Sequence, residues 1–199
     1  MKKIIMMLVT VFAICASGSC QNDKKQQENN KSEQQTAQTE NQKKTLVAYF
    51  SATGTTKAAA EKLANVTGGE LFEIVPEQPY TDADLDWRDK QSRSTLEMKD
   101  AKSRPAVKSK VDDIKKYDVI YVGFPIWWYI APTIINTFLE QYDLSGKVIV
   151  PFFTSGGSEA GETVKHLQPS APNAKILPAE NLTGDDEANI KKWVDSLKF

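Results

Sequence analysis

Cysteine and histidine are almost absent from this sequence. Its 199 residues include 2 cysteines, Cys15 and Cys20, and 1 histidine, His166. A disulfide framework needs more cysteines than this, and we find no spacing of Cys, His and Asp typical of a metal site. No credible Ser-His-Asp order surrounds His166, which we expect to be a surface residue. The sequence therefore indicates neither a disulfide-stapled module, nor a metalloenzyme, nor a triad hydrolase.

A strong charge of one sign is also missing. The formal net charge is −1, with 25 Lys and Arg against 26 Asp and Glu. Such a chain has no strong attraction for nucleic acid, so we expect no nucleic-acid partner. Apolar residues make up 40% and charged residues 26% of the chain, as in ordinary globular proteins. The length suits one domain with additional segments.

A long apolar run is the third absence. Residues 4–16 are apolar but too few to form a stable transmembrane helix, and two lysines precede them, as in a signal peptide. Three small residues then lead into Cys20, which resembles a bacterial lipoprotein signal. The resemblance implies cleavage after residue 19 and a diacylglyceryl group on the Cys20 thiol, in an exported protein anchored to a membrane and facing the periplasm or the cell exterior. The alternative is an ordinary cleaved signal with a chance cysteine.

A polar segment follows the cysteine. Residues 21–44 contain Ala37 as their only apolar residue, so they cannot bury enough surface to fold alone. We expect residues 20–44 to be a lipidated cysteine and a disordered tether, with a typical reach of roughly 25–30 Å. The folded domain would then span residues 45–199.

Short apolar runs alternate with helical patterns along residues 45–199. Strands are expected at residues 46–50, 70–75, 117–124, 147–153 and 174–177, and helices at 55–66, 131–141, 159–167 and 185–197. The third and fourth runs are almost continuously apolar, which is typical of central parallel strands buried on both faces. The alternation predicts an α/β fold with a parallel sheet.

One charged segment interrupts this alternation. Residues 77–104 are long and poor in aliphatic side chains. Part of this segment, residues 82–99, can be helical, and a further helix is expected near residues 107–116. We expect the segment to pack over the sheet edge or over a ligand site.

The loop after the first strand has the composition of a phosphate site. It places hydroxyls, a glycine and a helix N-terminus together, and their N–H groups and dipole attract an anion. It lacks the Gly-Lys-Ser/Thr ending of a Walker A loop and is no Rossmann glycine fingerprint. The loop consists of Ser51, Ala52, Thr53, Gly54, Thr55 and Thr56.

Two further loops follow the third and fourth strands. Ligands bind outside the carboxyl ends of the strands in an open parallel sheet, so all three loops should meet at one edge. The second loop offers an apolar, aromatic wall with Pro125, Ile126, Trp127 and Trp128. The third loop offers hydroxyls and close backbone approach with Thr154, Ser155, Gly156 and Gly157.

Together the loops closely resemble those of the flavodoxin family. Tyr49, Ser51, Gly54 and Thr56 stand at that family's spacings, and a Pro-x-Trp element and a Thr-Ser-Gly-Gly run follow. The resemblance covers residues 45–199. It implies a flavodoxin-like three-layer sandwich, a five-stranded parallel sheet in the order 2-1-3-4-5, and one bound FMN. The first loop would hold the phosphate and the other two the flavin ring.

Either tryptophan of the second loop could stack on the ring. Flavodoxins carry Pro-x-Trp here, which matches Trp127, whereas quinone reductases of the same fold carry Phe-Pro-x-x-Trp, which matches Trp128. We favour Trp128, and we expect the other tryptophan to belong to the core.

The resemblance implies an electron-transfer protein that supplies no catalytic acid or base and serves redox proteins or small electron acceptors. One alternative is an FMN-dependent NAD(P)H:quinone-type oxidoreductase. Such reductases often carry a Tyr and a His after the Gly-Gly loop, and residues 159–162 contain no tyrosine. A flavin-free binding module of the same fold is a third possibility, against which the intact phosphate loop argues.

Overall fold

The computed structural model describes residues 43–199. The predicted signal peptide, Cys20 and nearly all of the predicted tether lie outside the described residues. The fold and the site below belong to the described part of the chain alone.

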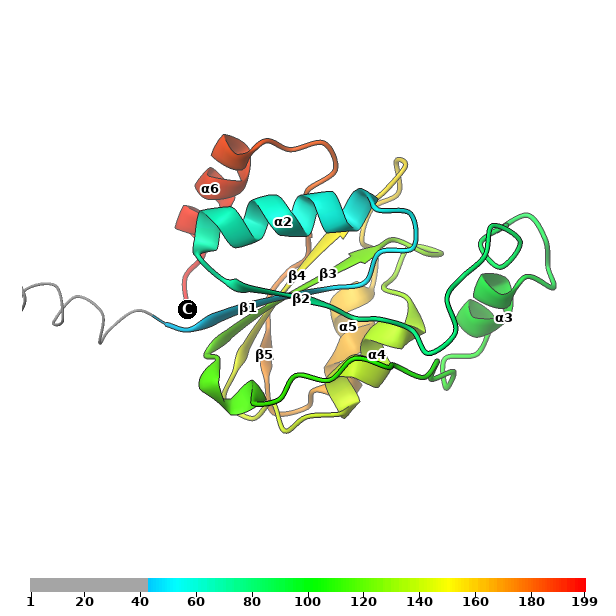
Figure 1. Ribbon diagram of the computed structural model, residues 1–199, viewed down its shortest axis with the longest axis horizontal. Coiled ribbons are helices and arrows are strands. Elements are labelled where there is room, and N and C mark those ends of the chain that lie inside the picture. The colour runs from blue at the N-terminus through cyan, green and yellow to red at the C-terminus, as the bar shows by residue number, and fades with distance from the viewer. Residues whose placement is uncertain (1–42) are drawn as a thin grey trace, which may run out of the picture. The chain divides into compact units, whose positions relative to one another are not determined.

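A parallel β-sheet forms the centre of the domain (Figure 1). Its strands are β1 (Thr45–Tyr49), β2 (Glu70–Glu73), β3 (Val119–Pro125), β4 (Val148–Thr154), β5 (Lys175–Ile176) and β6 (Glu180–Asn181). The order is β2-β1-β3-β4-β5, with β6 also paired to β4, and all pairs are parallel. The predicted order 2-1-3-4-5 is confirmed, and a sixth strand is added.

The sixth strand continues the fifth along the same edge. Ile149 pairs with Ile176, whereas Phe152 pairs with Glu180, so the edge strand gains one residue between the two pairs. Pro178 lies in this interval, and a proline has no N–H to donate to a ladder. The apolar pattern of a strand is interrupted at the proline, so the predicted fifth strand ends at residue 177.

Helices cover both faces of the sheet. They are α2 (Thr55–Thr67), α3 (Arg93–Lys99), α4 (Thr133–Glu140), α5 (Thr163–Leu167) and α6 (Glu187–Ser196), with 3₁₀ turns η1 (Ile114–Lys116) and η2 (Gln168–Ser170). Figure 1 shows α2 and α6 on one face and α4 and α5 on the other, with α3 beyond the strand ends. The predicted three-layer sandwich is confirmed. Between residues 43 and 199, no helix has the length and apolar character needed to cross a membrane.

The central strands bury both of their faces. On β1, Leu46 and Ala48 belong to one core cluster, and Val47 and Tyr49 belong to the other. The first three of these side chains are fully buried and Tyr49 is 2% exposed. Burial of a valine or leucine side chain stabilises a fold by about 1.5–3 kcal/mol. This double burial explains the nearly continuous apolar runs in the sequence.

Gly123 of β3 makes room for an aromatic ring in the α2/α6 layer. It pairs with Phe152 of β4, and a Cβ atom at position 123 would overlap with the Phe152 ring. Phe152 is fully buried. A glycine inside a strand is typical of such a close approach.

The helix expected near residues 107–116 is wrong. Only η1 forms there, while Val107 makes an antiparallel bridge with Pro76, and the N–H of Lys108 donates to the Val75 carbonyl at 2.8 Å. Val107, Ser109 and Val111 alternate with charged or polar residues at period two, which suits an extended chain better than a helix.

Within residues 82–99 only α3 is a regular helix. Asp86 and Asp89 accept N–H bonds from Arg88 and Gln91, at 3.1 and 2.8 Å, and such local side-chain bonds compete with helix formation. Helix α5 is also shorter than expected, because Gly161 has a φ of 47° just before it.

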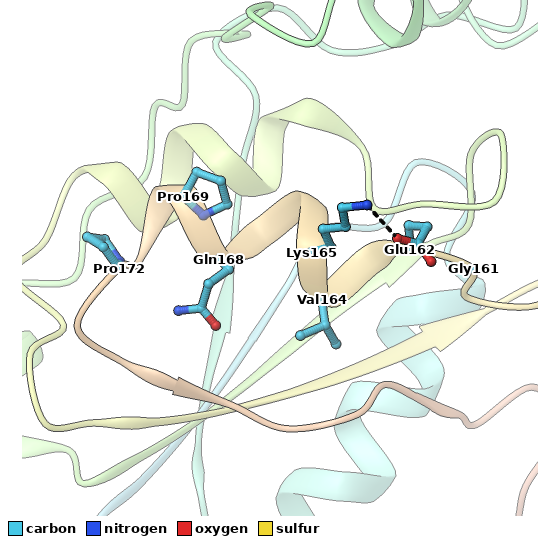
Figure 2. Close-up of a pocket in the computed structure, with 7 residues that line it drawn as sticks. All are labelled: Gly161, Glu162, Val164, Lys165, Gln168, Pro169 and Pro172. Carbon is cyan, nitrogen blue, oxygen red and sulfur yellow. Dashed lines mark ion pairs between the residues drawn. The ribbon is translucent and has the colours of Figure 1, made fainter.

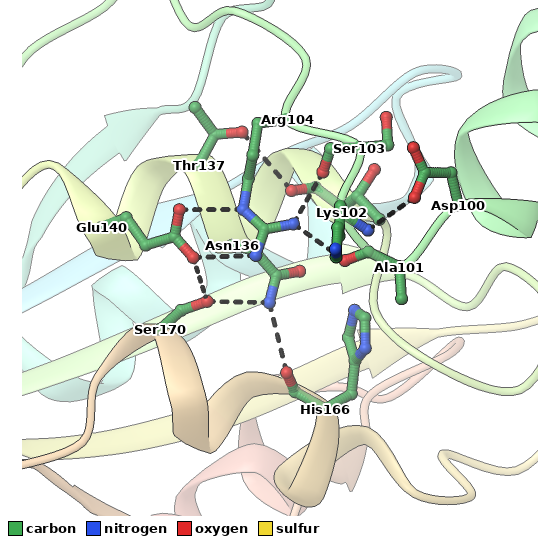
Figure 3. A network of polar contacts seen from close by, with 11 residues as sticks. Asp100, Ala101, Lys102, Ser103, Arg104, Asn136, Thr137, Glu140, His166 and Ser170 are labelled. Carbon is green, nitrogen blue, oxygen red and sulfur yellow. Dashed lines mark hydrogen bonds and ion pairs between the residues drawn. The ribbon is translucent and has the colours of Figure 1, made fainter.

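A polar network fastens the end of the 77–104 segment to α4 and η2 (Figure 3). The Arg104 guanidinium donates to both Glu140 oxygens at 2.8 and 2.9 Å, and the Ser170 hydroxyl donates to Glu140 at 2.7 Å. The Asn136 amide donates to Ser170 and to the His166 carbonyl, at 3.0 and 3.2 Å. His166 thus joins this network from α5 rather than standing free on the surface.

This network makes the stability of the domain depend on pH. Arg104, aided by Ser170, holds the pKa of the Glu140 carboxyl below its ordinary value of 4.5. A lowered native pKa means that the extra stability is fully present above pH 4.5 and is lost as the pH falls through the native value. We expect Glu140→Gln to lower the free energy of unfolding at neutral pH, and we expect the difference from the parent to shrink progressively as the pH falls below 4.5. Urea unfolding over a series of pH values measures it.

Glu61→Gln is the matched control, because Glu61 is an exposed glutamate of α2. We expect this control to unfold like the parent at neutral pH. A Glu140→Gln deficit that persists unchanged in acid would contradict the proposed role of the charge. Burial and Arg104 also lower the pKa of His166 below 6.5, so its protonation destabilises the fold in the same direction, but at a higher pH.

Candidate functional site

The loop after β1 leads into helix α2, whose first backbone N–H groups have no side-chain cap. Gly54 caps α2 in the left-handed region, with φ 90°, and α2 has no side-chain cap. The Gly54 N–H donates to the Ser51 hydroxyl at 3.1 Å, which folds the loop back on itself. The first-turn N–H groups of a helix have no intrahelical acceptor. In α2 no capping side chain accepts a hydrogen bond from them. Together with the helix dipole they favour an anion, as the sequence predicts.

A buried hydroxyl pair ties the first loop to the third. The hydroxyls of Thr56 and Thr154 lie 2.7 Å apart, and both residues are buried. In the third loop the Ser155 hydroxyl accepts the N–H groups of Gly157 and Ser158, at 3.1 and 2.6 Å. These bonds hold two of the three loops in one arrangement.

The loop after β3 is a strained hairpin turn. Trp127 and Ile130 exchange two backbone hydrogen bonds of 3.1 Å, and Trp128 and Tyr129 between them have φ of 48° and 67°. This is the pattern of a type I′ turn, which favours Asn-Gly. Among the described residues, no other non-glycine has a positive φ. Left-handed positions of this kind cost on the order of 1–3 kcal/mol each and cluster at functional sites.

The two tryptophans occupy different surroundings. The Trp127 ring packs edge-on against Phe50 and Tyr80, with centroid distances of 5.7 and 5.3 Å. Trp128 is 43% exposed and Tyr129 is 64% exposed. Trp127 is therefore held by other aromatic rings, while Trp128 is open to a ligand. Stacking of Trp128 on a flavin stays a prediction.

The three loops line one cavity of about 730 Å³, a size typical of small-molecule sites. The predicted residues that line it are Ala52, Thr53, Thr56, Pro125, Ile126, Trp127, Trp128, Ser155 and Gly156. Ser51, Gly54, Thr55, Thr154 and Gly157 are not among the lining residues. Several of these shape the loops through the bonds described above. A side chain at Gly156 would meet no neighbouring atom, so the cavity is open along this backbone.

The 77–104 segment supplies the wall that the predicted site lacked. Leu85, Trp87 and Ser94 line the same cavity, as do Tyr129 and Ser158. Trp87 is 72% exposed. A lone tryptophan in a charged segment was the available signal, because a large exposed apolar side chain often marks a binding surface.

Tyr80 fastens this wall to the sheet. Its ring contacts Phe50 at a centroid distance of 5.6 Å, besides Trp127, and its hydroxyl donates to Glu97 at 2.6 Å. The Arg93 guanidinium lies 4.0 Å from the same ring centroid and pairs with Glu97 at 2.7 Å. Burial, with Glu97 as a second cause, raises the pKa of the Tyr80 phenol, which stays neutral. The wall is thus part of the folded domain.

The cavity suits a ligand with a neutral ring and one anionic end. No Asp, Glu, Lys, Arg or His occurs among the described residues that line it, and residues 43–199 contain no group of three side chains that could hold a metal ion. Aromatic and glycine-lined walls fit a flat ring, and the bare N-terminus of α2 fits a phosphate. These residues therefore fit a flavin nucleotide.

A second hollow of similar volume lies along α5 and η2 (Figure 2). It is lined by Gly161, Glu162, Val164, Lys165, Gln168, Pro169 and Pro172, and Glu162 and Lys165 form an exposed ion pair of 3.2 Å. None of the three loops at the strand ends contributes to it. We therefore place the functional site in the first cavity.

Comparisons with known proteins bear on the family and the fold of this chain. The family model described as Flavodoxin matches residues 44–197. A search of curated proteins gives no significant match. Among solved structures, a protein from Bacteroides eggerthii DSM 20697 described as a flavoprotein is 52% identical, with a TM-score of 0.74, over 78% of this chain and 99% of that one.

Two other solved structures extend the comparison. A protein from Bacteroides uniformis ATCC 8492, also described as a flavoprotein, is 50% identical with a TM-score of 0.74, over 77% of this chain and 99% of that one. A flavoprotein from Lactobacillus acidophilus NCFM, solved in complex with FMN, is 28% identical with a TM-score of 0.62, over 76% of this chain and 99% of that one.

Proposed function

Because this chain belongs to the flavodoxin family, we propose that it binds one FMN in the cavity at the strand ends and passes electrons. One observation carries the proposal: a bare helix N-terminus and an aromatic wall line the same uncharged cavity. The similar flavoprotein that was solved with FMN supports the choice of this nucleotide.

Each loop has a role in this proposal. The first-turn N–H groups of α2 and the Thr53 hydroxyl bind the phosphate. Trp128 stacks on the ring, and the backbone at Gly156 bonds the polar edge of the ring. When bound, FMN supplies the redox chemistry, while the chain binds, orients and tunes it. No Asp, Glu, Lys, Arg or His side chain lines the cavity in the described part of the chain, which favours a carrier over an enzyme with such an acid or base of its own.

Stepwise reduction under anaerobic conditions tests the proposal. We expect protein purified with FMN to be yellow, to bleach on reduction and to recover its spectrum with a one-electron acceptor, without release of flavin. Colourless protein after incubation with FMN and gel filtration would refute FMN binding. Rapid consumption of NADH or NADPH in the presence of a quinone would instead favour the alternative of an NAD(P)H:quinone-type oxidoreductase.

We also propose that the protein is exported and held at a membrane through Cys20. The short apolar segment, the small residues before Cys20 and the polar segment after it support this proposal. The FMN domain would then work at the end of a polar tether, facing the periplasm or the cell exterior.

Substitution of the anchor cysteine tests this location. We expect Cys20→Ala to move the protein from the membrane fraction to the soluble fraction and to abolish incorporation of a labelled fatty acid. Cys15→Ala is the matched control, since Cys15 would leave with the signal peptide, and it should fractionate like the parent. A Cys20→Ala protein that keeps both its membrane fraction and its lipid label would disprove the anchor.

A further inference from the structure

The Trp128-Tyr129 turn needs support from another part of the chain. Both residues have a positive φ, of 48° and 67°, and non-glycine residues keep such angles only where the surrounding structure enforces them. The two backbone bonds between Trp127 and Ile130 close the turn, but both lie within the hairpin itself. A contact that holds the turn from outside must therefore come from a neighbouring loop.

Gly161, which lies just before α5 (Figure 2), packs directly against this turn. A Cβ atom at position 161 would lie 2.6 Å from the Tyr129 carbonyl oxygen and 3.3 Å from the Tyr129 Cβ atom. The first distance is too short for a real Cβ, so any other residue at this position would push the Tyr129 backbone away. Glycine has no Cβ and therefore lets the two backbones lie this close together.

A left-handed turn alone does not explain Gly161, although its φ is 47°. Six glycines in the described part of the chain have a positive φ, and Gly161 is the one among them with a neighbour within 4 Å of its Cβ position. The Cβ positions of Gly146 and Gly184, whose φ are 74° and 77°, face open space. The close contact with Tyr129 is thus a property of position 161, not of left-handed glycines in this fold.

The segment that carries Gly161 is fixed at both ends. Toward β4, the Ser155 N–H donates to the Thr183 hydroxyl at 2.9 Å. Toward α5, the Thr163 N–H donates to the Ala160 carbonyl at 3.0 Å, and Thr163 is buried. A segment held in this way can resist the strain of the turn instead of yielding to it.

We propose that Gly161 is a positioning residue for the flavin. Its backbone holds the Tyr129 backbone in place, and this keeps the adjacent Trp128 ring against the flavin. The inference rests on the proposed function and names the residue through which the loop before α5 fixes the stacking ring. Gly161 is not among the residues that line the flavin cavity, so it acts on the ligand through the turn.

Gly161→Ala tests this inference in the full-length chain. The added methyl group should displace Tyr129 and Trp128, so we expect the Kd for FMN to rise by up to about tenfold, the factor expected for loss of a stacked ring. The midpoint potential of the bound flavin should rise as well, because the negative face of a stacked indole disfavours the electron-rich reduced flavin. Calorimetry and an anaerobic redox titration measure the two effects.

Gly146→Ala is the matched control. It places alanine at a left-handed φ of 74° in the turn before β4, where its Cβ meets no neighbour. Its stability should fall, since alanine is strained at such an angle, but its Kd for FMN and its flavin potential should equal those of the parent. If Gly161→Ala also equals the parent in both quantities, the inference is overturned.

Gly161→Asn is a second variant that keeps the test decisive should Gly161→Ala fail to fold. Asparagine adopts left-handed angles more readily than alanine, so the variant should fold at a lower cost. Its Cβ would meet Tyr129 in the same way. We expect the same rise in the Kd for FMN, and an unchanged Kd in folded Gly161→Asn would contradict the positioning role.

A Trp128→Ala background separates positioning from a general loss of structure. If Gly161 acts through the Trp128 ring, adding Gly161→Ala to this background should change the Kd for FMN by less than about twofold. An equally large rise in both backgrounds would overturn the inference. A parent chain that binds no FMN overturns the proposed function and this inference together. A parent that binds FMN no more tightly than Trp128→Ala overturns the inference alone.

Discussion

FMN should bind to this protein at least about a hundredfold more tightly than riboflavin, which lacks the phosphate. The bare N–H groups of α2 are available to the phosphate, and each hydrogen bond to a charged group contributes about 1.5–3 kcal/mol. Two such bonds already correspond to a factor above about 100 in Kd. Calorimetric titration of the flavin-free protein with both ligands measures the ratio.

Two substitutions test which loop is responsible for the preference for FMN over riboflavin. Thr53→Val removes a lining hydroxyl of the first loop and should narrow the FMN/riboflavin ratio several-fold. Ser158→Ala removes a lining hydroxyl of the third loop and should leave the ratio unchanged, because both ligands carry the same ring. Equal affinities of the parent for FMN and riboflavin would disprove the phosphate site.

Replacing Trp128-Tyr129 with Asn-Gly should stabilise the flavin-free protein and weaken FMN binding. Both residues have a positive φ in a type I′ turn, and Asn-Gly adopts that turn with little strain. Relief of this strain should raise the free energy of unfolding by about 1–3 kcal/mol. Loss of the Trp128 ring should raise the Kd for FMN about tenfold. Denaturant unfolding and calorimetry measure the two effects separately.

Trp127→Ala is the contrasting variant. Trp127 packs against Phe50 and Tyr80, so its truncation should cost about 3 kcal/mol of stability, near the lower end for aromatic core residues. The two variants should therefore have different effects: the loss of Trp128 weakens FMN binding, whereas Trp127→Ala lowers the stability of the fold. If both variants retain the FMN affinity of the parent, neither ring stacks on the flavin.

Residue pattern was sufficient to predict the parallel strands and most of the helices, whereas the strand order came from the resemblance to the flavodoxin family. The continuous apolar runs of β3 and β4 are typical of central strands in a parallel sheet, which are buried on both faces. In such a sheet the loops at the carboxyl ends of the strands lie at one edge, where ligands bind. The three loops were therefore predicted together, and the structure places nine of their residues in one cavity. These parts depend on local pattern and on one topological rule.

Other parts depend on contacts that a pattern does not encode. Asp86 and Asp89 turn the chain where helical periodicity was plausible, and Val107 pairs with Pro76 across a long loop. The hairpin turn at Trp128 contradicts the local preference for Asn-Gly, so no turn rule finds it. Departures of this kind are expected at functional sites, where the surrounding fold compensates for the local cost.

The interrupted edge of the sheet affects how readily copies of this protein aggregate at high local concentration. An exposed strand edge is a template on which neighbouring molecules can add strands and aggregate. Here one edge is β2, with four residues, and the other is split into β5 and β6, with two residues each, around Pro178. Neither edge offers a long, regular row of N–H and C=O groups. Many copies of this domain can therefore be crowded side by side without polymerising through their sheets.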